Sequence, residues 1–168
     1  FRSTKQQVIL HNYSSSHTDR VSDRLVEPFG FTTNYVQIWC YEPDSQLNKL
    51  FNTARIEKVE ILNKEWEYEE HHRKGYIDIF RISGYEQHRV QLILGVLSYN
   101  LLTEEYPLST RDIHRIDNNH WKLDTLVSNY VGIGRFVMGL YSDITIITPE
   151  FQEYINQIIR ERYNSIKE

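Results

Sequence analysis

The pattern of apolar residues changes once along this chain, at a charged stretch that ends near Gly75. Before it, short strand-like runs are separated by turn-forming residues about every ten positions, at 8–13, 24–27, 35–41, 50–51 and 55–62. After it, strand-like runs alternate with segments whose apolar residues recur at helical spacing. The sequence therefore predicts two domains of different architecture, residues 1–74 and 75–168.

The first part is typical of a small all-β unit. Its third run is rich in aromatic and β-branched residues and ends at 42–45, where Glu-Pro-Asp-Ser is turn-forming. Short strands at this spacing indicate a small, partly open β-barrel.

The second part predicts both strands and helices. The expected strands lie at 76–82, 90–94, 112–116, 121–127 and 144–147. One helix should end at Pro107, and the last should begin with Thr148 as N-cap and Pro149 at its first position. From residue 90 the order is strand, helix, strand, strand, helix, strand. This is the split βαβ order of a ferredoxin-like fold, here with a C-terminal helix appended.

The charge balance argues against a dedicated duplex-DNA clamp. The chain has 19 Lys and Arg against 23 Asp and Glu, a formal net charge of −4, whereas phosphate binding needs a clustered basic excess.

The longest uncharged stretch, 90–103, is shorter than the ~20 residues of a membrane span. We expect a cytoplasmic protein with no membrane partner. Because the sequence starts at Phe1 without a signal peptide, we interpret it as a fragment of a longer protein.

Reactive side chains are few and scattered. Cys40 lies in an apolar run and is predicted to be a buried packing residue. His71 and His72 are adjacent, without the spacing of a zinc site, and are predicted to lie in a charged, solvated linker. No catalytic constellation emerges, so we expect a protein that is not an enzyme and has no cofactor or metal.

Several motifs occur in an order that resembles one known family. In the first part they are residues 9–15, Arg24 with the Pro-Phe-Gly-Phe run at 28–31, and 49–56; in the second part they are 101–107, 117–121 and 144–151. Over nearly the whole chain this order resembles the WYL-domain family of bacterial transcriptional regulators with its C-terminal WCX extension. The chain departs from the family pattern at Gln37, which replaces the eponymous tyrosine. It also departs at Asn52, which replaces the first arginine of the family's Phe-Arg-x-x-Arg-Ile motif and leaves Arg55 as the single cation of that motif.

The resemblance implies a fold and a function. The fold class would be α+β, an SH3/Sm-like β-barrel followed by a ferredoxin-like βαββαβ domain with an appended C-terminal helix. The barrel would bind a negatively charged effector, single-stranded nucleic acid or a nucleotide, and the extension would serve dimerisation and ligand gating. An N-terminal winged helix-turn-helix outside these residues would bind operator DNA as part of a homodimer. The candidate ligand-binding residues are Tyr13, Ser15, Arg24, Gln37, Asn52 and Arg55.

Each candidate also has a plainer interpretation. Arg24 and Arg55 could form surface ion pairs with Glu27 or Glu57, the ring of Tyr13 could pack in the core, and Gln37 could simply face solvent. For the whole chain, the alternative is a structural dimerisation module with a degenerate pocket and no ligand. An enzyme that acts on nucleotides is a third option.

Overall fold

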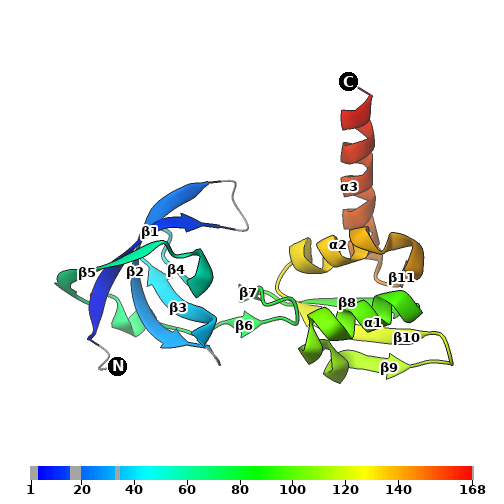
Figure 1. Cartoon of the computed structure of the whole chain (residues 1–168), viewed down its shortest axis with the longest axis horizontal. Helices are drawn as coiled ribbons and strands as arrows, with labels where there is room; N and C mark the ends of the chain where they lie inside the picture. The colour runs from blue at the N-terminus through cyan, green and yellow to red at the C-terminus, as the bar shows by residue number, and fades with distance from the viewer. Residues whose placement is uncertain (1–3, 16–19, 33–34, 168) are drawn as a thin grey trace. The chain divides into compact units, whose positions relative to one another are not determined.

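The chain divides into two compact units, Phe1–Gly75 and Tyr76–Glu168 (Figure 1). The computed structural model describes residues 4–15, 20–32 and 35–167. Each unit is built on antiparallel strands, and the helices longer than one or two turns belong to the second unit. The fold class is therefore α+β, as predicted.

One five-stranded antiparallel sheet forms the first unit, in the order β4-β3-β2-β1-β5. Its strands are β1 (Gln6–Ser14), β2 (Val21–Phe31), β3 (Gln37–Glu42), β4 (Leu47–Asn52) and β5 (Lys58–Glu65). β4 and β5 are the two edges, and within the part of the chain that the structure describes no pairing between them closes the sheet.

Three local differences from the predicted strands have physical causes. β2 continues through Pro28, because a register shift between Pro28 and Gly30 accommodates a residue that has no N–H to donate. β3 begins two residues later than predicted, because Tyr35 has a left-handed backbone with φ of 57°. The run at 55–62 is interrupted, because Thr53–Arg55 forms a 3₁₀ turn before β5 begins.

Side chains pack on both faces of this sheet, although its edge strand β5 is largely exposed. On one face the buried side chains form a single cluster of Val8, Leu10, Tyr13, Val26, Cys40 and Phe51. Cys40 is fully buried, which confirms its predicted packing role. On the other face, Trp66 donates from its indole Nε1–H to the Gln6 carbonyl at 3.0 Å, and His72 stacks on Phe29 with ring centroids 4.6 Å apart.

The prediction of a solvated linker is therefore wrong for His72, whose side chain is only 8% exposed. A run of charged residues predicts solvent exposure, but here the aromatic residues interspersed among them pack the segment onto the sheet. This segment contains the 3₁₀ turn η3 (Glu69–His71).

The second unit is a four-stranded antiparallel sheet packed against helices, in the strand order β11-β8-β10-β9. Its strands and α-helices are β8 (His88–Leu94), α1 (Val96–Glu105), β9 (Ile113–Arg115), β10 (Trp121–Val127), α2 (Tyr130–Gly139), β11 (Ile144–Ile146) and α3 (Pro149–Ile166). The 3₁₀ helices η4 (Pro107–Asp112) and η5 (Tyr141–Asp143) precede β9 and β11. The predicted order of strands and helices from residue 90 is confirmed, as is the end of α1 before Pro107.

A single hydrophobic core joins the sheet and all three helices. It includes Leu92 and Leu123 from the sheet, Leu102 from α1, Val137 from α2 and Phe151 from α3, each fully buried. Burial of this apolar face is the main reason for the helices to remain on the sheet.

The run predicted as one strand at 76–82 is instead a short hairpin of β6 (Tyr76–Ile77) and β7 (Ser83–Gly84). The buried carboxylate of Asp78 accepts hydrogen bonds from the backbone N–H groups of Phe80, Ile82 and Ser128 at 2.9, 3.0 and 3.1 Å. An alternating pattern cannot reveal this turn, because the turn depends on one aspartate bonding the backbone that follows it.

The C-terminal half of α3 extends away from the body of this unit (Figure 1). Thr148 is its N-cap residue, as predicted, but the Thr148 hydroxyl accepts from the backbone N–H of Gln91 at 2.8 Å instead of capping the helix. Among residues 4–15, 20–32 and 35–167, no helix has the length and apolar character needed to cross a bilayer.

Candidate functional site

Three of the predicted ligand-binding residues meet at one end of the first sheet. The hydroxyl of Tyr13, on β1, accepts a hydrogen bond from the backbone N–H of Asn52 at 3.1 Å. Gln37, the first residue of β3, is paired with Asn52, the last residue of β4. Antiparallel pairing places such residues directly opposite each other, so residues far apart in the sequence come together here.

Asn52 also shapes the segment that follows it. Its side-chain Oδ1 accepts from the backbone N–H of Ala54 at 3.0 Å and caps the 3₁₀ turn Thr53–Arg55. The hydroxyl of Thr53 donates to the carbonyls of Tyr35 and Val36, both at 3.0 Å. The turn is thus fastened to the connection between β2 and β3, and Arg55 is its last residue.

Arg55 is exposed, and its guanidinium makes no hydrogen bond or ion pair with the residues that the structure describes. The alternative partner named from the sequence, Glu57, instead accepts from the side chain of Asn12 at 2.7 Å. Arg55 therefore offers a cation that is positioned by its backbone but is not neutralised by a neighbour.

Tyr13 stabilises this site from within the core. Its side chain is only 6% exposed, and its ring packs edge-on against Phe51 with centroids 4.9 Å apart. A ring buried in this way cannot stack on a ligand, so Tyr13 serves the site through the hydrogen bond that fixes Asn52.

Two exposed aromatic residues beside the same turn were not among the predicted site residues. Phe31 and Tyr35 are 41% and 72% exposed, and their rings meet edge-on at 5.2 Å. The only sequence signal is that aromatic residues flank a short polar connection, and strand-forming propensity explains that signal equally well.

Arg24 lies in a different cluster. Its guanidinium donates to Oε1 of Glu42 at 3.3 Å, and the Lys49 ammonium and the Ser45 hydroxyl bond the other carboxylate oxygen. Glu42 is nearly fully buried. Burial raises its pKa, but the hydrogen bonds from Lys49 and Ser45 and the nearby positive charges lower it further, so the pKa lies below its ordinary value. The ion-pair partner of Arg24 is thus Glu42 rather than Glu27 or Glu57.

Ser15, the remaining candidate, is half-buried and follows the last residue of β1. The turn-forming polar run that starts at Ser14 in the sequence continues into residues 16–19, which lie outside the described residues.

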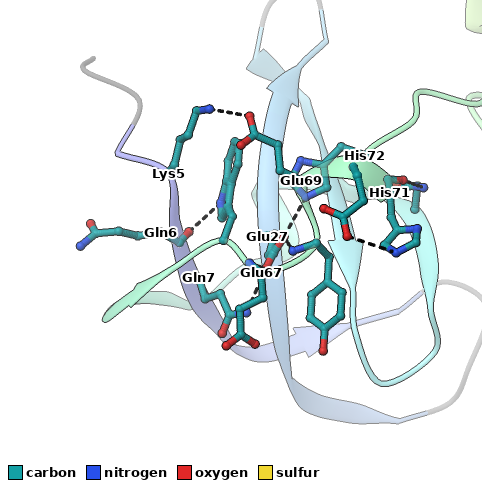
Figure 2. Close-up of polar contacts among 12 residues, drawn as sticks. Lys5, Gln6, Gln7, Glu27, Glu67, Glu69, His71 and His72 are labelled. Carbon is teal, nitrogen blue, oxygen red and sulfur yellow. Dashed lines mark hydrogen bonds and ion pairs between the residues drawn. The ribbon is translucent and has the colours of Figure 1, made fainter.

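A third polar cluster surrounds Glu27, which is fully buried (Figure 2). One carboxylate oxygen accepts from Gln7 Nε2 at 2.9 Å and the Glu67 backbone N–H at 2.7 Å; the other accepts from the Tyr68 N–H at 3.2 Å and bonds His72 Nε2 at 2.8 Å. Burial raises the pKa of Glu27, but these four hydrogen bonds together lower it below its ordinary value. The cluster fastens the segment after β5 onto the sheet.

Two of these three clusters are built around a buried carboxylate, Glu27 or Glu42, whereas the turn after β4 carries an exposed arginine. Over the ranges 4–15, 20–32 and 35–167, no group of three or more His, Cys, Asp or Glu side chains could hold a metal ion. The turn after β4 carries the exposed Arg55 and is bonded through Thr53 to the backbone of Tyr35, whose ring is exposed. Guanidinium groups and exposed aromatic rings are side chains that suit phosphate and base recognition.

Comparison with known proteins finds a likeness among solved structures but not among sequences. No protein-family model and no curated protein sequence matches the chain. Among solved structures, the chain is similar to proteasome accessory factor B/C (PafBC) of Arthrobacter aurescens, at 15% sequence identity and a TM-score of 0.39. The match covers 88% of this chain and 23% of that chain, so this sequence spans less than a quarter of the matched structure.

Proposed function

We propose that this chain is the effector-sensing regulatory region of a bacterial transcriptional regulator of the WYL-domain kind, and that it is not an enzyme. Unit 1 would be the WYL-type barrel that binds a negatively charged effector, and unit 2 the WCX-type extension. The observation that carries the proposal is Arg55, an exposed cation with no partner among the described residues, held at the end of β4 by a capped turn.

The order of the strands supports the finer description of both folds. In unit 1, only pairing between the edge strands β4 and β5 would be needed to close the sheet into an SH3/Sm-like barrel. In unit 2, α1 follows β8 and α2 connects β10 to β11, and the order β11-β8-β10-β9 is that of a ferredoxin-like split βαβ unit.

The side chains of Arg55, Phe31 and Tyr35 support the choice of effector. A guanidinium presents several N–H donors in a fixed plane that matches phosphate oxygens. The exposed rings of Phe31 and Tyr35 offer surfaces on which a base can stack. Single-stranded nucleic acid and nucleotides carry both groups, and we propose an effector of this chemistry.

Regulation would follow from differential binding. An N-terminal winged helix-turn-helix, outside these residues, would bind operator DNA, and the effector would bias a homodimer between DNA-competent and incompetent arrangements. Such a bias requires that the effector bind the two arrangements with different affinities.

Fluorescence anisotropy of a labelled short single strand tests the proposal. Arg55→Ala should weaken binding by about tenfold, since it removes one charge-assisted contact. Lys64→Ala, which removes one exposed cation from the far end of β5, should leave affinity within about twofold. Competition by unlabelled nucleotides shows whether a nucleotide alone is sufficient to occupy the site. Weak, salt-insensitive binding that is equal in the wild type and Arg55→Ala would exclude the proposal.

A structural dimerisation module without a ligand is the second candidate, and one observation favours it. Ile159, Tyr163 and Ile166 recur at helical spacing on the protruding half of α3 and are 37%, 58% and 82% exposed. This apolar stripe is suited to pairing with a second copy of the helix.

A further inference from the structure

The second unit carries an open cleft of about 440 Å³ that is separate from the Arg55 site. It is lined by Tyr99 of α1, Thr110 of η4, Ile113 and Arg115 of β9, and Trp121 of β10. Arg115 is paired with Trp121 across the two strands, so both side chains lie on the sheet face that α1 covers. The volume falls in the range of small-molecule sites.

One wall of the cleft is aromatic. The rings of Tyr99 and Trp121 are stacked with centroids 4.1 Å apart and an interplanar angle of 5°. Both side chains are only half-buried. Neither the Tyr99 hydroxyl nor the Trp121 Nε1–H bonds to another residue in the described part of the chain. The wall therefore has an apolar surface and polar groups still able to bond a ligand.

Arg115, beside Trp121, gives the cleft a positive charge. Arg115 donates from Nε to the backbone carbonyl of Asp117 at 2.9 Å and from one terminal nitrogen to Oδ1 of Asn118 at 3.3 Å. Both acceptors are neutral, and no carboxylate among the described residues forms an ion pair with this guanidinium. The carboxylate of Asp117 is itself bonded to the Asn119 N–H and the His120 ring. The turn orients Arg115 without neutralising it, and leaves N–H donors for a ligand.

We propose that this cleft is a binding site for a small planar aromatic carboxylate. The ligand ring would lie against the aromatic wall and Ile113, and the carboxylate would bond the guanidinium of Arg115. The guanidinium carbon lies 5.9 Å from the centroid of the Trp121 ring, which places the charge and the aromatic surface within the reach of one small molecule. Thr110, whose hydroxyl donates to the Pro107 carbonyl at 2.9 Å, can still accept a hydrogen bond at the rim.

The tryptophan indole signals in a ¹⁵N–¹H correlation spectrum of the whole chain provide the test. The chain has three tryptophans, and Trp39 and Trp66 belong to the other unit. Indole-3-carboxylate should shift the Trp121 indole signal in a saturable way and leave the other two in place. Indole-3-carboxamide, which has the same ring without the charge, should bind about tenfold more weakly.

Two variants test whether the preference for the carboxylate depends on the charge of Arg115. Arg115→Gln should abolish the preference for the carboxylate over the amide. Lys122→Gln removes a neighbouring cation on the other sheet face of β10 and should leave the preference intact. Equal affinity for both ligands in the wild type overturns the proposal, whether or not Arg115→Gln folds. A shift of all three indole signals, or none, also overturns it.

Discussion

At the scale of single residues, three buried carboxylates organise this molecule. Glu27, Glu42 and Asp78 are 0%, 3% and 1% exposed, and each accepts several hydrogen bonds. A buried carboxylate is tolerated only when donors replace the water it has lost. Each of the three therefore fixes the segment that supplies its donors.

The acid sensitivity of the fold should depend on Glu27. Its pKa is lower in the folded chain than its ordinary value of 4.5, so its stabilising effect is present above that pH and is lost as the pH falls through the folded pKa. Glu27→Gln should lower the free energy of unfolding at neutral pH by about 2 kcal/mol and reduce its loss in acid. Urea titrations at neutral pH and below the ordinary glutamate pKa measure both effects.

Glu69→Gln is the matched control, because this carboxylate lies in the same segment but is exposed and paired with Lys5. It should leave both the stability and its pH dependence nearly unchanged. An unaltered acid response in Glu27→Gln would mean that the Glu27 carboxylate does not contribute to stability in this way.

Arg24 should matter for stability rather than for ligand binding. Its partner Glu42 is buried, so Arg24→Ala leaves that charge with fewer donors and should cost about 1–2 kcal/mol of unfolding free energy in urea. The affinity of the folded variant for a single strand should equal that of the wild type. The opposite result, lost affinity at unchanged stability, would place Arg24 in the effector site.

The sequence predicts part of the Arg55 site. The resemblance to the family brings Tyr13, Gln37 and Asn52 into one group, and the structure places these three together. The packing of Tyr13 and the pairing of Arg24 with Glu42 depend on how far the sheet curls, which no short motif determines. Tyr35 is not predicted as a site residue, because its sequence context is that of a strand, whereas the structure gives it a left-handed backbone and an exposed ring.

At the scale of elements, strong periodicity gave the most accurate predictions. The strand at β8, the hairpin of β9 and β10 and the terminal helix α3 agree with the sequence to within one or two residues. Predictions failed where a single side chain overrides the pattern. Asp78 turns the chain within an alternating run, and the bonds of His72 and Trp66 hold a charged segment on the sheet.

The start of α1 depends on one side chain of η5. The carboxylate of Asp143 accepts from the Ser98 N–H at 2.7 Å, and its backbone carbonyl accepts from the Gly95 N–H at 2.9 Å. A Cβ on Gly95 would lie 2.3 Å from the Asp143 carboxylate. Gly95→Ala should therefore displace this cap and lower the unfolding free energy by about 1–2 kcal/mol, measured by urea unfolding.

Gly139 provides the comparison, because a Cβ there meets nothing within 4 Å. Gly139→Ala should leave stability unchanged or raise it by up to about 1 kcal/mol, since alanine restricts the unfolded chain. If both glycine variants behaved alike, the close approach of Asp143 would not be what requires glycine at position 95.

At the scale of the whole molecule, the exposed stripe on α3 predicts self-association. Tyr163→Glu places a charge in the middle of this stripe and should shift a homodimer toward the monomer in sedimentation equilibrium. Gln157→Glu adds the same charge to an exposed position of α3 outside the stripe and should leave the dimer intact. A wild-type chain that sediments as a monomer at every concentration would exclude this role for α3.

The net charge of −4 describes the molecule as a whole and does not describe its sites. Arg55 and Arg115 each present a positive charge locally, in different units, within an acidic chain. Binding of a short anionic ligand at one such site therefore needs no overall basic excess, whereas tight binding of long duplex DNA does.

The salt dependence of single-strand binding tests the Arg55 site most directly. Each phosphate contact contributes about 0.7 to the slope of log affinity against log salt concentration for a single strand. We predict that Arg55→Ala reduces the measured slope by this amount and that Lys64→Ala retains the wild-type slope. Identical slopes in the wild type and Arg55→Ala would contradict the assignment of Arg55 as the residue that contacts the effector.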